Sequence, residues 1–260
     1  MTKTASLAVV TGASRGIGRE IAITLAHHGW DVAFSHLGDA AEAAEVSGLI
    51  TATGRKALAI RCDVGVKDEV WAFYRAVMDT FGRAPDLLVN NAGVQTWASL
   101  LELAEADWDR VIRTNLKGCF LNTQRAAQLM VEHGIRGSIV NLGSACNKVA
   151  FPRLVDYTAS KGGIEQFTKV SATELGPHGI RVNCVAPGAI EHERTKQEAP
   201  DYAATWARIT PLQRVGSTAD VAKEVHFLAT DAAGFVTGQT IYVDGGAFTM
   251  PNWPYPQEKK

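Results

Sequence analysis

Short apolar runs that favour β-structure alternate with helical patterns along almost the whole chain, and this alternation constrains the fold more than any other feature. The apolar runs cover residues 7–10, 31–34, 57–60, 86–89, 137–142, 180–185 and 240–243. After the first run, Ile17, Ile21 and Leu25 recur at helical spacing. Further helical patterns cover residues 39–53, 67–81, 107–133, 156–176 and 218–229. Such alternation predicts a parallel α/β sheet with helices on both faces, whose continuous apolar strands are buried on both sides.

The 260 residues are predicted to form a single domain, because no linker, repeat or low-complexity segment interrupts them. Two segments depart from the alternation. Residues 189–215 form a long charged excursion, which we interpret as a lid over a site, with a plain surface insertion as the alternative. Residues 248–260 form a proline-containing tail, either a frayed end or a docking arm. We hypothesise that Trp253 and Tyr255 in this tail cover a site.

Charge and cysteine patterns exclude several classes of protein. The chain has 26 basic and 27 acidic residues without any charged block, so binding to nucleic acid or a membrane surface has no electrostatic basis. The four cysteines lack CxxC or zinc-site spacing, which predicts free, buried thiols and no metal site. No signal peptide or segment of transmembrane length is evident, so we expect a cytoplasmic protein.

The sequence TGASRGIG (11–18) directly follows the first apolar run and precedes a helical pattern. Gly12, Gly16 and Gly18 allow the backbone to approach a pyrophosphate closely, and the start of the next helix offers free N–H groups and a positive dipole end. Glycines also serve ordinary turns, so the position between a strand and a helix carries the interpretation. This stretch therefore predicts a dinucleotide site.

Tyr157 and Lys161, within YTASK, are four residues apart and so share one face of a predicted helix. An ammonium group near a phenol favours the phenolate, as a general acid/base requires. Ser144 follows the run at 137–142, at the sheet edge where ligands of open α/β sheets bind. Its hydroxyl could bond a substrate oxygen beside Tyr157. For Tyr157 and Lys161 alone, a surface pair is the alternative.

Together, TGASRGIG, NNAG at 90–93 and YTASK at 157–161 resemble the short-chain dehydrogenase/reductase family over roughly residues 5–247. The resemblance implies a Rossmann fold with a seven-stranded parallel sheet in the order 3-2-1-4-5-6-7, usually as a homotetramer. It also implies a catalytic tetrad of Asn115, Ser144, Tyr157 and Lys161. In such a tetrad Asn115 holds a water for a proton relay, while Tyr157 exchanges a proton with the substrate and a nicotinamide cofactor exchanges the hydride.

The resemblance assigns a further set of residues to the cofactor, which are Gly12, Ser14, Arg15, Gly16, Ile17, Gly18, His36, Asp63, Val64, Asn91, Ala92, Gly93, Tyr157, Lys161, Pro187, Gly188 and Ile190. Asp63 is expected to read the adenine amino group. Family members often have a threonine that bonds the carboxamide in a PGxIxT stretch. This chain reads PGAIEH, so either His192 at that place or Thr195 three residues later is the candidate.

The end of the second strand bears on the choice between NAD and NADP. Many NAD-preferring relatives have an aspartate where His36 stands, and that carboxylate repels a 2′-phosphate. His36 does not repel it, and Arg15 supplies a cation for it. Leu37 stands where NADP-preferring relatives often have a second arginine. We therefore predict NADP, with NAD as the alternative.

The stretch ACNKVAFPRLVD (145–156) and the later VDGGAF resemble bacterial aldose dehydrogenases, and ketoacyl reductases are also similar. The predicted substrate pocket combines polar and aromatic groups, namely Gln95, Trp97, Cys146, Asn147, Arg153, His192 and Arg194. Such groups suit a sugar, and Arg153, Arg194 and Lys148 would suit an anionic one. We predict a sugar dehydrogenase that yields a lactone. A 3-oxoacyl thioester or other ketone reductase is the alternative, and a dinucleotide-sensing protein is the non-enzyme alternative, although sensing alone does not need the tetrad.

Overall fold

The computed structural model describes residues 5–38 and 40–249. Seven parallel strands form one sheet in the order β3-β2-β1-β4-β5-β6-β9. These strands are β1 (Leu7–Val10), β2 (Asp31–His36), β3 (Ala57–Arg61), β4 (Leu87–Asn90), β5 (Ser138–Leu142), β6 (Arg181–Pro187) and β9 (Thr240–Val243). The order matches the prediction from the sequence, with β9 as the seventh strand of this sheet.

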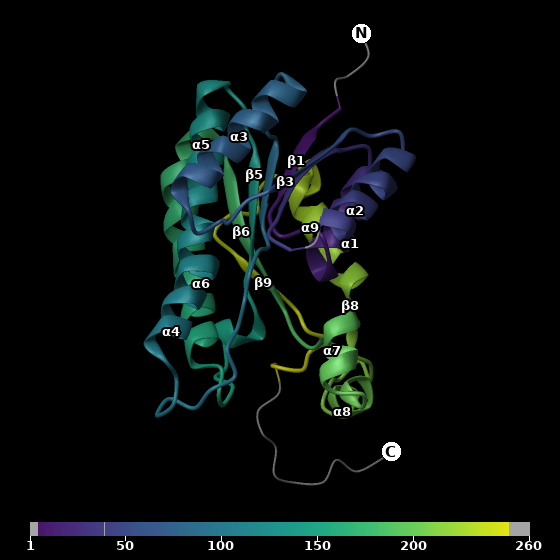
Figure 1. Ribbon diagram of the computed structural model, residues 1–260, viewed down its shortest axis with the longest axis vertical. Helices are drawn as coiled ribbons and strands as arrows, with labels where there is room; N and C mark the ends of the chain where they lie inside the picture. Colours follow the sequence, from purple (N-terminus) through teal and green to yellow (C-terminus); the bar gives the residue numbers. More distant parts are fainter. Residues whose placement is uncertain (1–4, 39, 250–260) are drawn as a thin grey trace.

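Helices cover both faces of the sheet (Figure 1). One face carries α1 (Gly16–His27), α2 (Ala40–Ala52) and α9 (Thr218–Ala229), and the other carries α3 (Lys67–Phe81), α5 (Gly118–Glu132) and α6 (Val155–Leu175). Neighbouring strand residues point to opposite faces, so Val10 joins the apolar cluster under the first group and Val9 joins the cluster under the second. Both faces are therefore buried, which explains the continuous apolar runs.

The continuous helix predicted over residues 107–133 is interrupted. It consists of α4 (Glu105–Val111), a π-helical segment (Ile112–Lys117) and α5. Asn115 lies in the π-helical segment and is only 1% exposed. A π-helical turn widens the helix locally and is often found at functional sites. Apolar periodicity did not reveal it, since one wide turn barely changes the pattern of the helix around it.

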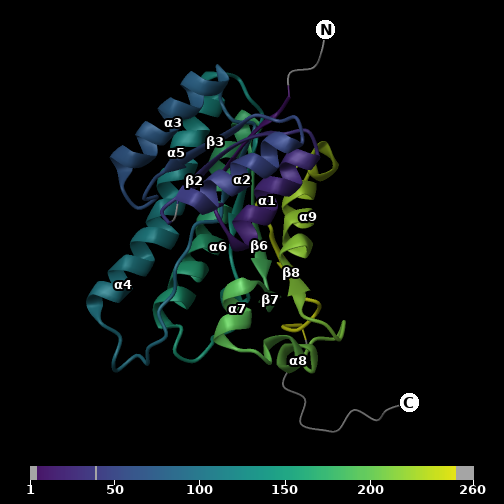
Figure 2. The same cartoon turned by 45° about the vertical axis from the view of Figure 1, so that its right-hand side comes forward.

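The excursion over residues 189–215 is folded. It contains β7 (Ile190–Glu191), α7 (Glu193–Glu198) and α8 (Tyr202–Ala207), and β7 pairs in parallel with β8 (Gly216–Ser217) just beyond it. Figures 1 and 2 both show α7 and α8 beyond the ends of the strands, at the edge of the sheet where the site is expected. Of the predicted tail, Trp253 and Tyr255 lie outside the described residues.

All four cysteines are free and buried, as the sequence predicted: Cys62, Cys119, Cys146 and Cys184. Burial raises the pKa of Cys62 and of Cys119 to about 12, and that of Cys184 to about 11. These three thiols therefore stay protonated at neutral pH and serve packing. Within residues 5–38 and 40–249, no helix combines the length and the apolar character that crossing a membrane requires.

Candidate active site

The residues after β1 form a turn that fits a pyrophosphate. Gly12 and Gly16 have φ angles of 66° and 59°, in the region that favours glycine. A Cβ on Gly12 would stand 2.9 Å from the Cα of Ala92, and one on Gly18 would stand 2.6 Å from the carbonyl oxygen of Gly12. These glycines therefore let the turn pack tightly on itself and on the loop after β4. The turn leads into the start of α1, and a helix start after a glycine-rich turn is a place where phosphate groups bind.

Thr11 and Asn91 hold this turn against the loop after β4. The Thr11 hydroxyl accepts hydrogen bonds from the backbone N–H groups of Asn91 and Ala92, both at 3.0 Å. In return, the Asn91 amide donates to the carbonyl oxygens of Thr11 at 2.9 Å and Gly12 at 3.0 Å. Asn91 thus braces the turn. Thr11 was missed in the sequence, where only its position directly before Gly12 could have indicated it.

Asp63, the expected adenine contact, is held by two partners. Its carboxylate accepts from the backbone N–H of Gly65 at 2.9 Å and pairs with Arg113 at 3.0 Å. Arg113 belongs to the π-helical segment, so this segment contacts a predicted cofactor residue as well as containing the predicted catalytic residue Asn115. Nothing in the local sequence around Asp63 indicates Arg113, because the two residues meet only through the fold.

A carboxylate that the sequence did not predict lies beside the phosphate turn, in the helix that follows β2. His36 is buried at the end of the strand, and Arg15 is exposed at the start of α1. The hydroxyl of Ser14, which precedes Arg15, donates to the carboxylate of Glu42 at 3.3 Å. Glu42 stands in the first turn of α2, where an acidic residue has an ordinary role in balancing the helix dipole. Because that role accounts for an acid at this position, there was no reason in the sequence to expect Glu42 beside the phosphate turn.

Lys161 and Tyr157 lie together on α6, as their spacing predicted. Lys161 is only 4% exposed, and its Nζ stands 5.4 Å from the centre of the Tyr157 ring. The same Nζ donates to the carbonyl oxygen of Leu142, the last residue of β5, at 2.6 Å. This bond fastens the helix to the sheet edge and fixes the ammonium group beside the phenol.

Ser144 begins the short 3₁₀ helix Ala145–Asn147. Its hydroxyl oxygen accepts from the backbone N–H of Cys146 at 3.2 Å, and the hydroxyl can still act as a donor. The Asn147 side chain accepts from the backbone N–H of Ser144 at 3.2 Å and donates to the Cys184 sulfur at 3.6 Å. Asn147 therefore helps to position Ser144, and Cys146 is buried. The substrate roles of both residues stay predictions.

The Asn115 amide links three parts of the site. Its oxygen accepts from the backbone N–H of Val94 at 2.8 Å, and its nitrogen donates to the Val94 carbonyl at 2.9 Å and to the Ser160 hydroxyl at 3.0 Å. Both N–H donors of the side chain are therefore used. The predicted water contact of Asn115 stays a prediction, and the structure adds a bracing role between the loop after β4 and α6.

The other predicted substrate residues occupy separate surroundings. Trp97 and Arg153 are exposed, and Arg153 has a φ of 67°, which is strained for a residue other than glycine. The Thr195 hydroxyl accepts from the backbone N–H of His192 at 2.9 Å and donates to its carbonyl at 2.8 Å. Thr195 is therefore engaged in starting α7. The roles predicted for Gln95 and His192 stay predictions, and the side chain of Arg194 lies outside what the structure describes.

Four rings that sequence reasoning did not connect form an aromatic cluster, namely Phe151, Tyr202, Trp206 and Phe248. They come from the loop before α6, from α8 and from the segment after β9. Phe248 reaches the PG stretch after β6, since its ring carbon would stand 3.3 Å from a Cβ on Gly188. The cluster therefore joins the excursion to the strand ends beside the predicted cofactor contacts Pro187, Gly188 and Ile190.

The parallel sheet has a glycine turn at its switch point, and Ser144, Tyr157 and Lys161 stand at its edge. This combination defines a dinucleotide-linked oxidoreductase. Comparison with known proteins agrees. The family model described as enoyl-(acyl carrier protein) reductase matches residues 12–248. The 3-oxoacyl-[acyl-carrier-protein] reductase FabG of Staphylococcus aureus is 42% identical over 248 residues, which cover 95% of this chain and 99% of that protein.

Two further relatives are similar along nearly their full length. The human (3R)-3-hydroxyacyl-CoA dehydrogenase is 39% identical over 250 residues, covering 94% of this chain and 95% of the relative. The solved structure of a proposed gluconate dehydrogenase from Agrobacterium tumefaciens is 35% identical with a TM-score of 0.89, covering 95% of this chain and 97% of that one. The chain belongs to the short-chain dehydrogenase/reductase family and is an oxidoreductase.

Proposed function

We propose that this enzyme interconverts a 3-oxoacyl thioester and the corresponding 3-hydroxyacyl thioester with NADP(H). The observation that carries the proposal is the 42% identity to a 3-oxoacyl-[acyl-carrier-protein] reductase along 95% of the chain. The aromatic cluster beside the site supports it, because such rings suit the apolar part of an acyl substrate. A sugar dehydrogenase, expected from the sequence, is the second candidate, and the 35% identity to a proposed gluconate dehydrogenase favours it.

The glycine turn with Gly12 and Gly18 would hold the pyrophosphate of the cofactor, and Asp63 would bind its adenine. When bound, the nicotinamide supplies the hydride for reduction and accepts it in oxidation. In reduction, the Ser144 hydroxyl donates to the substrate carbonyl oxygen, and Tyr157 transfers its proton to that oxygen as the carbon gains the hydride. The carbonyl thereby becomes a secondary alcohol, and the nearby ammonium of Lys161 stabilises the phenolate that remains.

We propose NADP(H) because His36 stands where an acid would repel a 2′-phosphate and Arg15 is exposed at the adjoining turn. Glu42 acts against this preference, since its carboxylate lies 3.3 Å from the Ser14 hydroxyl in the same turn. Selection between the two cofactors therefore depends on a cation and an anion at one place, and NAD(H) remains the alternative.

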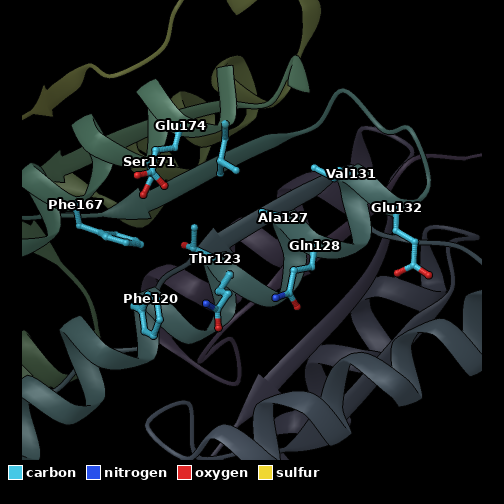
Figure 3. A pocket seen from close by; sticks show the side chains of 11 residues that line it. Phe120, Thr123, Ala127, Gln128, Val131, Glu132, Phe167, Ser171 and Glu174 are labelled. Atoms are coloured by element: carbon cyan, nitrogen blue, oxygen red, sulfur yellow. The ribbon is translucent and has the colours of Figure 1, made fainter. Parts of the chain in front are cut away.

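We propose that the enzyme assembles as a homotetramer through the face formed by α5 and α6. A groove of about 500 Å³ lies between these helices, and none of the four tetrad residues lines it. Figure 3 shows Phe120, Ala127 and Val131 on one side of the groove and Phe167 and Ser171 on the other. Phe120 and Val131 are exposed, so a second copy of the chain would bury them favourably.

We further propose that the enzyme acts in the cytoplasm. The support is the set of four free cysteines, which suits a reducing compartment where disulfides rarely form.

The proposed reaction is tested with a substrate panel and a matched pair of tyrosine variants. We expect a 3-oxoacyl thioester to be reduced with NADPH, followed by the absorbance of the reduced nicotinamide, and aldoses or acidic sugars to react poorly. Tyr157→Phe should abolish turnover and keep cofactor affinity. Tyr74→Phe, in which the lost hydroxyl bonds the carbonyl of Asn122 in α5, should keep turnover. Turnover with sugars alone would overturn the thioester assignment in favour of the second candidate.

A further inference from the structure

Two consecutive residues at the end of β5 hold α6, the helix that contains Tyr157 and Lys161. The carbonyl oxygen of Leu142 accepts the bond of 2.6 Å from the Lys161 ammonium. The side chain of the preceding residue, Asn141, donates through its Nδ2 to the hydroxyl oxygen of Thr168 at 2.9 Å. Thr168 follows Lys161 by about two helical turns, so both stand on the buried face of α6. The strand therefore fixes the helix at two points along its length.

The orientation of the Asn141 amide is set by its other partners. The Thr168 hydroxyl donates to the carbonyl oxygen of Ile164 within α6 at 2.8 Å, so its oxygen is left to accept from Asn141. The amide oxygen of Asn141 accepts from Nδ2 of Asn90 at 2.8 Å and from the thiol of Cys119 at 3.4 Å. Burial raises the pKa of that thiol to about 12, so it stays protonated and able to donate. Turning the amide over would set its N–H groups against these two donors, so it has one orientation.

Asn141 belongs to a buried network that joins the neighbouring strands β4 and β5 to the helices α5 and α6. Asn90, which lies opposite Asn141 in the register of the two strands, also donates to the hydroxyl oxygen of Thr123 in α5 at 2.9 Å. Asn90, Thr123, Asn141 and Thr168 are all buried. Away from water such bonds are strong and a missing one is costly, so the network resists displacement of its members. The end of β5 consequently has a fixed place along α6.

Building on the proposed function, in which Lys161 stabilises the Tyr157 phenolate, we propose that Asn141 is a positioning residue for that lysine and acts through Thr168. The bond from Lys161 to Leu142 does not suffice, because a flexible lysine side chain can follow a shifted helix. The short side chains of Asn141 and Thr168 allow no such adjustment. If α6 shifted along β5, the ammonium would either leave the Leu142 carbonyl or keep it and lose its present place 5.4 Å from the centre of the Tyr157 ring.

The test removes the Thr168 hydroxyl and keeps the branched shape of the side chain. We expect Thr168→Val to lower kcat about 10-fold and to change KM less than about 2-fold, because a small misplacement of catalytic groups lowers the rate steeply. Thr168→Ser and Thr168→Ala differ from each other only in the hydroxyl; the serine variant should keep kcat and the alanine variant should lose it. This pair decides the question if Thr168→Val does not fold.

Thr123→Val is the matched control, because it removes the equivalent hydroxyl from the α5 end of the same buried network. It leaves an N–H of Asn90 without its partner, as Thr168→Val leaves one of Asn141. Both variants should therefore have a lower thermal unfolding temperature than the wild type. Only Thr168→Val breaks the bond between β5 and α6, so Thr123→Val should keep the wild-type kcat.

A second readout needs neither substrate nor cofactor. The ultraviolet absorbance of phenolate, taken as the difference between each protein and its Tyr157→Phe counterpart, follows the ionisation of Tyr157. Without a fixed ammonium beside it the phenolate is less favoured, so in Thr168→Val this signal should appear about 0.5 pH unit above that of the wild type. In Thr123→Val it should stay in place.

Equal losses of kcat in Thr168→Val and Thr123→Val, or a phenolate signal that does not move in Thr168→Val, would mean that the network serves stability alone; either result overturns the proposal. If the wild-type protein reduced no 3-oxoacyl thioester, the proposed function would fail, while a shifted phenolate signal would still support Asn141 as a positioning residue. Wild-type turnover with an unshifted signal in Thr168→Val would remove the positioning role and leave the proposed function standing.

Discussion

The Asn115 side chain donates a hydrogen bond of 3.0 Å to the Ser160 hydroxyl, so the π-helical segment is tied to the turn of α6 that carries Lys161. The same amide satisfies both the N–H and the carbonyl of Val94. We expect Asn115→Ala to lower the free energy of unfolding by about 3 kcal/mol, since it leaves these partly buried groups without partners. It should also lower kcat, because Lys161 is no longer fixed beside Tyr157.

Denaturant unfolding and steady-state kinetics measure the two effects of Asn115→Ala separately. Asn122→Ala is the matched control, because Asn122 is equally buried and its amide donates to the Gly118 carbonyl within its own helix at 2.9 Å. The Asn122→Ala variant should be less stable than the wild type and have the same kcat. If both variants lost kcat in proportion to stability, Asn115 would have no particular link to the catalytic lysine.

We expect Glu42→Gln and His36→Asp to change the cofactor preference in opposite directions. Glu42→Gln removes a negative charge 3.3 Å from the Ser14 hydroxyl, so the ratio of kcat/KM for NADP to that for NAD should rise about 5-fold. His36→Asp introduces a carboxylate at the end of β2, so the ratio should fall. Glu45→Gln is the control, because Glu45 pairs with Arg19 on the exposed surface at 2.9 Å and should leave the ratio unchanged. A constant ratio in Glu42→Gln would exclude Glu42 from selection.

The sheet and its helices could be predicted because their signals are local. Each strand is one apolar run, such as Leu7–Val10, and each long helix repeats its apolar face over several turns. Short or irregular elements give no such signal. The helices α7 and α8 have six residues each, and the π-helical segment occupies one wide turn. Their positions depend on packing against the rest of the fold rather than on their own sequence.

The residues of the candidate site also divide into those with a local sequence signal and those without one. Tyr157, Lys161 and Ser144 stand in compact motifs, so their chemistry can be deduced from spacing and position. Arg113 carries no motif, and its role exists only where the fold brings it against Asp63. Asn147 shows a further contribution of the fold, because its amide, predicted to bind a substrate, also bonds the Ser144 N–H and the Cys184 sulfur.

His28 and His226 make the stability of the enzyme depend on pH. Their rings lie 3.8 Å apart between α1 and α9, and burial, followed by the charge of His28, lowers the pKa of His226. The unfolded chain, with a histidine pKa of about 6.5, then binds more protons than the folded one as the pH falls through that value. Acidification therefore destabilises the fold, and stability returns as the pH rises.

The measurement is the thermal unfolding temperature of wild type and His226→Gln between about pH 7 and about pH 5. We expect the wild-type temperature to fall on acidification and the variant to lose less. The exposed His178 in the turn after α6 provides the control, since His178→Gln should follow the wild-type curve. Parallel curves for all three proteins would assign the pH dependence to other groups.

A substitution of Phe120 tests the proposed assembly through α5 and α6 most directly. It is exposed at the groove between these helices and meets the Phe167 ring edge to face at 6.3 Å. Phe120→Glu places a charge where a second copy would bury the ring, and an unpaired charge in an interface core opposes association. Light scattering after size-exclusion chromatography should show a tetramer for wild type and a smaller species for this variant. Phe235→Glu, at a fully exposed ring outside the groove, should keep the wild-type mass. A tetramer that persists in Phe120→Glu would place the interface on another face.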